Sequence, residues 1–132
     1  MTNEEKQLLL KDLCGRLPYG VIIHNEEGYE GHLNSINQTI FGIELGVNIT
    51  ATHRVDFQLD TCKPYLRPMS SLIGKELDEC RATCKYRRVG QSVLDCATPQ
   101  TIDYLVSHHF DYRGLIPMGL ALEAHEDMYK TE

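Results

Sequence analysis

The feature that most constrains the fold of this chain is a series of short β-rich segments over residues 19–67, separated by turn residues instead of helical stretches. The β-branched run at residues 21–23 leads into turn residues at 25–28. Over residues 55–59, apolar and polar side chains alternate, which is the spacing of a half-buried strand. Four or five short strands joined by tight turns predict a small curled antiparallel sheet or an SH3-like barrel.

Two interior turns are expected within this β-rich part. Asn37 and Gln38 form a polar break between strands over residues 29–36 and 39–45. Residues 46–48, which begin with a glycine, form a second break, and residues 49–59 supply one or two further strands.

The N-terminal segment has the pattern of an amphipathic helix. Thr2 and Glu5 match a capping box, in which each side chain accepts a hydrogen bond from the other residue's backbone amide. Leucines three and four residues apart give the segment one apolar face. Gly15 suits a C-terminal stop and Pro18 prevents continuation, so we expect a helix over residues 3–14.

The second half of the chain predicts two more helices and a closing loop. Two prolines make residues 62–68 a stiff, largely non-helical connector. The serine pair at 70–71 is expected to cap the second helix, and Thr98 and Pro99 begin a third that ends near residue 108. Glycines and a proline in residues 109–124 predict a folded loop with a short final strand or buried turn.

These patterns predict one α+β domain over residues 1–132. It comprises an N-terminal helix (1–17), a β-rich part (18–68) and a helical and loop part (69–132). Hydrophobic residues make up 42% of the chain and charged residues 24%, which is an ordinary globular composition. Because no stretch of eighteen consecutive apolar residues and no export signal occur, we expect a cytoplasmic protein that neither spans a membrane nor is secreted.

Charge is distributed unevenly along the sequence. The net charge is −6, yet residues 60–90 carry seven basic and four acidic side chains, so this zone is +3 and the remainder −9. A local basic zone suits a small anionic ligand, whereas the acidic remainder would repel bulk nucleic acid. A homo-oligomer would bury such a ligand further, although no pattern in the sequence requires one. The basic residues could also merely solvate an exposed helix, among them the stretch at 85–88.

Five cysteines in a chain without an export signal are interpreted as reduced thiols. Cys80 and Cys84 would share one helix face, but a zinc site would also need Cys62 or Cys96 and a histidine to converge on them. We therefore predict no metal and no cofactor.

The first candidate binding segment is the proline-braced connector. In an extended backbone Lys63, Tyr65 and Arg67 project to the same side and place two cations around an aromatic ring. This arrangement suits stacking on a base and contact with its phosphate. The alternative is an edge segment whose Leu66 packs in the core while its polar side is merely solvated.

The second candidate segment follows the third helix. His109, Asp111, Tyr112 and Arg113 supply ionisable and aromatic groups for a polar ligand pocket, with Arg113 as a bidentate clamp. A catalytic alternative pairs His108 or His109 with Asp111, although no serine or cysteine nucleophile adjoins them. A structural alternative makes Asp111 a helix or turn cap, Arg113 its ion-pair partner, and Phe110 and Tyr112 core residues.

Four strings are specific enough to support a family resemblance: LPYGV at 17–21, KPYLRPMSS at 63–71, HFDYRGLI at 109–116 and GLALEA at 119–124. Together they resemble short uncharacterised proteins encoded by phages, prophages and mobile elements of gut anaerobic bacteria. The resemblance implies expression inside a bacterial host and transfers no activity or catalytic residues. The stretch at 80–90 departs from it by being richer in cysteine and basic residues.

These observations favour a binding protein over an enzyme. The first hypothesis is sequestration of an anionic nucleotide-type signalling molecule to counter host defence, through Lys63, Tyr65, Arg67, His109, Asp111, Tyr112 and Arg113. The second is an SH3-like accessory module for nucleic acid or protein. The third is a phosphodiesterase-like hydrolase that uses His108 or His109 with Asp111. The sequence has no Walker loop, G-x-G-x-x-G, H-E-x-x-H or G-x-S-x-G motif, which removes the common nucleotide hydrolases, Rossmann enzymes, zincins and serine hydrolases.

Overall fold

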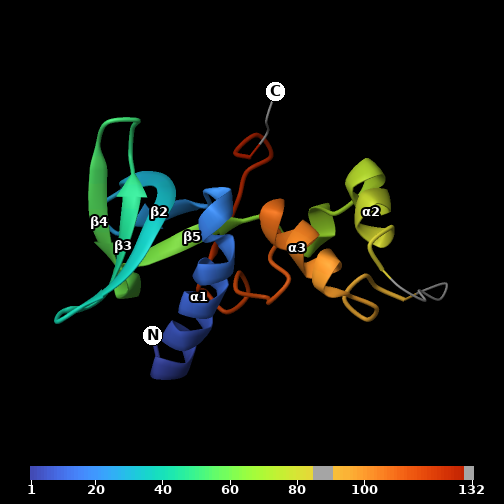
Figure 1. The fold of residues 1–132 in the computed structure, drawn as a ribbon, viewed down its shortest axis with the longest axis horizontal. Helices are drawn as coiled ribbons and strands as arrows, with labels where there is room; N and C mark the ends of the chain where they lie inside the picture. Colours follow the sequence, from blue (N-terminus) through green and yellow to red (C-terminus); the bar gives the residue numbers. More distant parts are fainter. Residues whose placement is uncertain (85–90, 130–132) are drawn as a thin grey trace.

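The computed structural model of the chain describes residues 1–84 and 91–129 (Figure 1). Its helices are α1 (Asn3–Arg16), α2 (Gly74–Arg81) and α3 (Pro99–Ser107). Its strands are β1 (Ile22–Asn25), β2 (Glu30–Thr39), β3 (Gly42–Asn48), β4 (Arg54–Gln58), β5 (Cys62–Leu66) and β6 (Leu122–Glu123).

The strands form one open sheet in the order β4-β3-β2-β1-β5-β6. Neighbouring strands are antiparallel except for β5 and the two-residue β6, which run parallel. The α+β class is therefore confirmed, with an N-terminal helix, a sheet and two further helices. Because β4 and β6 lie at opposite edges, the sheet does not close into the SH3-like barrel that was the alternative expectation.

The first helix begins as predicted and ends two residues later. The Thr2–Glu5 capping box is present, with both reciprocal hydrogen bonds. Gly15 lies inside the helix instead of ending it, and the chain leaves α1 through a 3-10 turn at Leu17–Tyr19. Gly20 follows with φ 64°, a left-handed conformation that glycine adopts without steric cost.

Both predicted interior turns of the β-rich part were wrong. Strand β2 continues through Asn37 and Gln38 to Thr39, and the turn lies at the following two residues. Gly46 lies within β3, paired with Ser35 of β2 and Asp56 of β4, and the Arg54 guanidinium crosses above it to donate to Ser35 Oγ at 2.6 Å. A side chain at position 46 would collide with that arginine, so this glycine permits a cross-strand contact and does not mark a break.

The connector and the second helix also differ from expectation. Residues 62–66 are extended as predicted, but they form β5 inside the sheet, where Pro64 lies opposite Ile23 of β1. The serines form part of a 3-10 turn at Met69–Ser71, which Ser71 closes by donating from Oγ to the Pro68 carbonyl. They therefore do not cap α2, whose N-cap residue is Ile73.

The third helix and the final segment follow the prediction closely. Helix α3 starts after a Thr98 cap that accepts from the Thr101 amide, and it buries Leu105 and Val106. The segment after it is mostly loop, and it ends in β6, which pairs with β5.

Two apolar clusters hold these elements together. The larger one packs Leu9 and Leu13 of α1 against the sheet, together with Leu115 and Leu120 of the C-terminal segment. The smaller one joins α2 and α3 around Phe110, and Figure 1 shows these two helices beside the β5 end of the sheet. Among the described residues, no helix is both long and apolar enough to cross a membrane.

Candidate functional site

The candidate site is a cleft of about 540 Å³ where β5, α2, α3 and the C-terminal segment meet. Its wall combines one guanidinium, three imidazoles, two carboxylates, two phenol rings and a hydroxyl. Such a wall offers stacking surfaces and polar contacts of both signs. The residues that supply these groups are Tyr19, Arg67, Glu76, Ser107, His108, His109, His125, Glu126 and Tyr129.

His109 is the most constrained residue of this wall. It is buried and has φ 65°, and it is the one non-glycine residue with positive φ among those described. Its Nδ1 is buried without a hydrogen-bond partner. Burial, reinforced by the nearby Arg16 charge, lowers the pKa of His109 to about 4, so its imidazole is neutral near pH 7. A strained, neutral, unpaired imidazole beside a cleft is the kind of feature that clusters at binding sites.

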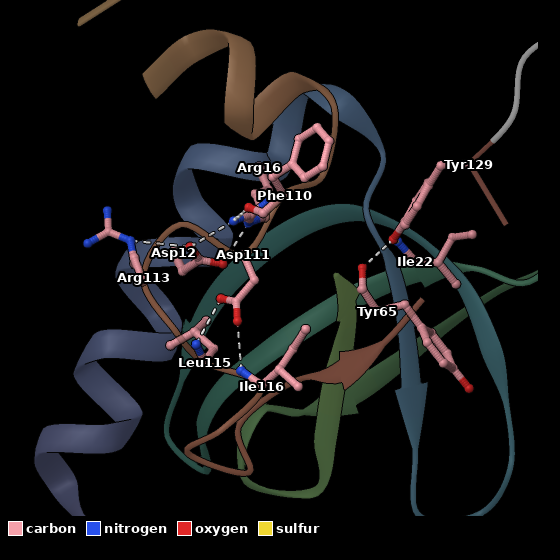
Figure 2. Close-up of polar contacts among 10 residues, drawn as sticks. All are labelled: Asp12, Arg16, Ile22, Tyr65, Phe110, Asp111, Arg113, Leu115, Ile116 and Tyr129. Carbon is pink, nitrogen blue, oxygen red and sulfur yellow. Dashed lines mark hydrogen bonds and ion pairs between the residues drawn. The ribbon is translucent and has the colours of Figure 1, made fainter. Parts of the chain in front are cut away.

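Tyr129 stacks on the ring of His109 and also bridges two strands of the sheet. The two rings are stacked with 3.8 Å between centroids. Figure 2 shows the Tyr129 hydroxyl between β1 and β5, where it accepts from the Ile22 amide at 2.8 Å and donates to the Tyr65 carbonyl at 2.6 Å. The C-terminal segment is thereby anchored to the sheet, and one wall of the cleft is fixed.

Arg67 is held by both its side chain and its backbone. Its guanidinium donates to both Glu76 carboxylate oxygens, at 2.8 and 2.6 Å, and lies 4.1 Å from the Phe110 ring centroid. The hydrogen bonds from Arg67 lower the pKa of Glu76. The Arg67 backbone amide donates to the His109 carbonyl at 2.7 Å, and the Arg67 carbonyl accepts from the Asp111 amide at 2.8 Å. The cation is therefore pre-positioned, but it is already partly neutralised by Glu76.

His108 lies next to this ion pair with a defined tautomer. Its ring stacks on Tyr104 with 4.0 Å between centroids. Its Nδ1 lies 2.9 Å from the Tyr104 carbonyl oxygen, and because a carbonyl only accepts, Nδ1 carries the hydrogen. In the tautomer that carries its hydrogen on Nδ1, Nε2 is the acceptor nitrogen of the ring.

Lys63 and Tyr65 lie on the less buried side of β5, as predicted, but do not line this cleft. Cys62, Pro64 and Leu66 are buried on the other side, so the predicted alternation is confirmed. Tyr65 donates its hydroxyl hydrogen to Glu30 at 2.6 Å, which raises the pKa of Tyr65 to about 12 and lowers that of Glu30. Its polar end is therefore engaged with β2.

Asp111, Tyr112 and Arg113 do not line the cleft. Figure 2 shows Asp111 and Arg113 in the loop beside α1. Asp111 caps a turn, since its two oxygens accept from the Leu115 and Ile116 amides at 2.8 and 2.9 Å. Arg113 lies 4.9 Å from the Tyr112 ring centroid. The structural interpretation therefore fits Asp111 as a cap, but the ion-pair partner of Arg113 is Asp12 of α1, at 3.2 Å, and not Asp111.

Asp12 and Arg16 form a buried ion pair that sequence reasoning missed. Their side chains are about 1% and 0% exposed, and Arg16 Nε lies 2.7 Å from Asp12 Oδ2. Arg16 also donates to the Phe110 carbonyl at 2.6 Å, which locks the loop after α3 onto α1. Their spacing of four residues was the available signal, but the predicted helix ended at residue 14 and left Arg16 outside it.

Cys62 lies in a different part of the fold from Cys80 and Cys84. Cys62 packs in the larger apolar cluster, where burial raises its pKa to about 12, whereas Cys80 and Cys84 pack in the smaller one. No group of three or more metal-binding side chains suited to an ion is present in residues 1–84 and 91–129. The basic stretch at 85–88 lies outside the described residues.

The structure thus brings together Arg67 and His109 from the predicted set and adds groups that the sequence did not point to. Glu76 comes from α2, whereas His125 and Tyr129 come from the C-terminal segment. His125 lies in a charged C-terminal stretch whose composition alone predicts only solvation. Comparisons with protein-family models, curated proteins and solved structures found no match to this chain.

Proposed function

We propose that this protein binds a small nucleotide-like molecule with a single phosphate in the cleft beside Arg67. The observation that carries this proposal is the presence, in one cleft, of a fixed guanidinium, the stacked rings of His109 and Tyr129, and the carboxylates of Glu76 and Glu126. A nucleotide presents the matching groups. Its phosphate can bind the guanidinium, its flat base can stack on the rings, and its amino and hydroxyl groups can donate hydrogen bonds to the carboxylates.

The charges of the cleft favour few phosphates. Arg67 is the only Arg or Lys among the described residues of its wall, and two glutamates line the same wall. A triphosphate would meet repulsion from both carboxylates, whereas one phosphate can share the guanidinium with Glu76. We therefore expect nucleoside monophosphates and cyclic mononucleotides to bind more tightly than nucleoside triphosphates.

Sequestration is a better fit than turnover. Asp111, the predicted partner of a catalytic histidine, has both carboxylate oxygens engaged by backbone amides. From the resemblance to phage and mobile-element proteins, we further propose that the bound molecule is a host defence signal. A sequestering protein should return its ligand chemically intact after heat denaturation, whereas a phosphodiesterase would return product.

The test measures binding of nucleoside monophosphates and 3′,5′-cyclic mononucleotides by calorimetry and thermal shift. A ligand at 100 times its Kd should add about 2.7 kcal/mol to the free energy of unfolding, a shift of several degrees in Tm. Glu76→Gln should tighten binding, because it removes a negative charge beside the phosphate and releases Arg67. The double variant Arg67→Gln/Glu76→Gln should weaken it at least tenfold while an amide pair preserves the packing.

Arg54→Gln is the matched control, because this arginine lies on β4 and does not line the cleft. It should leave the Kd unchanged. The proposal is wrong if no nucleotide of the panel binds the wild-type protein, or if Glu76→Gln and the double variant bind equally well.

A further inference from the structure

A second cleft, of about 520 Å³, adjoins the first. The two clefts share Arg67, His125 and Glu126, and each lies within the usual size range of small-molecule pockets. The second cleft extends over the 3-10 turn at Met69–Ser71 and along the segment that follows β6. A ligand seated in the first cleft can therefore continue past Arg67 into the second.

The walls of the second cleft are fixed by the backbone. The Ala124 amide donates to the Leu66 carbonyl at 2.8 Å, and Glu123 pairs with Leu66 in the sheet. The Ser71 amide and hydroxyl both donate to the Pro68 carbonyl, at 2.9 and 2.7 Å. Binding would therefore order little additional chain, which favours affinity.

The second cleft also has chemistry suited to a second base. Ile73 is 69% exposed at its edge, an apolar surface that the fold leaves uncovered. Glu123 lines the same cleft and offers a carboxylate to base amino or ribose hydroxyl groups. Apolar contact on one face and acceptors at the edge are what a flat heterocycle with N–H groups requires.

The position of the positive charge indicates where the anionic group of such a ligand would bind. Among the described residues, Arg67 is the only Arg or Lys in either wall, and it belongs to both. An anionic group is therefore favoured at the boundary, with one ring on each side. We infer that the ligand is a dinucleotide, with one base on His109 and Tyr129, a phosphodiester at Arg67, and the second base beside Ile73 and Glu123. This inference rests on the proposed function of the first cleft.

The test compares AMP with the linear dinucleotide ApA and with cyclic di-AMP by calorimetry on the full chain. At least one dinucleotide should bind ten times or more tightly than AMP, and the two dinucleotides distinguish a linear from a cyclic ligand. Ile73→Glu should abolish that advantage and leave the Kd for AMP within twofold. Ile40→Glu is the matched control, since Ile40 is 93% exposed at the β2–β3 turn and lies outside both clefts.

The possible failures are distinguishable. If AMP binds but neither dinucleotide binds more tightly, the inference is overturned and the proposed function stands. If Ile73→Glu weakens AMP and dinucleotides equally, or leaves the dinucleotide advantage intact, the second cleft is not the site of the second base. If neither AMP nor other mononucleotides and dinucleotides bind, the proposed function itself falls. Urea unfolding of each variant confirms that the comparison is made on folded protein.

Discussion

The His109 imidazole lies parallel to the Tyr129 phenol, with 3.8 Å between ring centroids and 16° between ring planes. One ring comes from the loop after α3 and the other from the C-terminal segment, so their contact joins two segments that line the cleft. The Tyr129 hydroxyl also forms hydrogen bonds with the backbone of strands β1 and β5. The stability of the sheet and the shape of the cleft are therefore linked through one side chain.

Tyr129→Phe should reveal the contribution of that hydroxyl. The ring and its stacking remain, but the Ile22 amide and the Tyr65 carbonyl lose their shared partner. Leaving such groups unpaired costs about 1–3 kcal/mol, which urea unfolding should show as a lower midpoint at an unchanged m-value. Tyr29→Phe is the control, because Tyr29 is 50% exposed, and its effect should stay within about 0.5 kcal/mol. Equal effects in the two variants would contradict the bridging role.

His109 should make the protein less stable as the pH falls. Its pKa is lowered from 6.5 to about 4 in the folded state, so between these values the unfolded chain binds more protons than the folded one. Stability therefore rises with pH across this window, by on the order of 2 kcal/mol from this residue alone. The measurement is the free energy of unfolding at several pH values between 4 and 7.5.

His109→Asn is the informative variant, because asparagine tolerates φ near 65° and does not titrate. It should flatten the pH dependence between pH 4 and 6.5. His53→Asn, a change at an exposed turn residue, should retain the wild-type slope. A wild-type slope in His109→Asn would show that another group causes the acid sensitivity.

The buried ion pair of α1 should be sensitive to loss of one partner. Asp12→Ala leaves the fully buried Arg16 charge without its carboxylate, and such losses cost about 3–5 kcal/mol. Asp12→Leu/Arg16→Met removes both charges of this pair, although it also leaves Arg113 without its Asp12 partner, and it should cost less than the sum of Asp12→Leu and Arg16→Met. Lys6→Ala breaks the more exposed Lys6–Asp60 pair and should cost less than about 1 kcal/mol. Additive effects of the two buried changes would contradict the coupling.

Most of the fold was predictable from local patterns. The capping box of Thr2 and Glu5, the Thr98 cap and the alternation along β5 each depend on neighbouring residues, and all three are present. The errors arose where distant residues decide the outcome. Gly46 resembles a turn glycine, but it pairs with β2 and β4 inside β3, and the Arg54 side chain from β4 occupies the space that a side chain at position 46 would need.

The cleft was less predictable for the same reason. Arg67 and His109 stood out because each lies in a segment rich in ionisable and aromatic groups. Glu76 and Tyr129 carry no local signal, since their roles depend on contacts with Arg67 and with His109 across the fold. Conversely, residues 111–113 are rich in ionisable and aromatic side chains but do not line the cleft. Asp111 caps a turn, and Arg113 pairs with Asp12 of α1.

Asp111→Asn separates a structural role of this carboxylate from a catalytic or ligand-binding one. An amide oxygen can still accept from either the Leu115 or the Ile116 amide, but its NH2 group would then face the other donor. We expect a loss of about 1–3 kcal/mol in the free energy of unfolding. The Kd for AMP should stay within twofold of wild type at a temperature where both proteins are folded, because Asp111 does not line the cleft. Asp56→Asn, on the exposed face of β4, should change neither quantity. Normal stability with lost binding or lost product formation would instead place Asp111 in contact with the ligand.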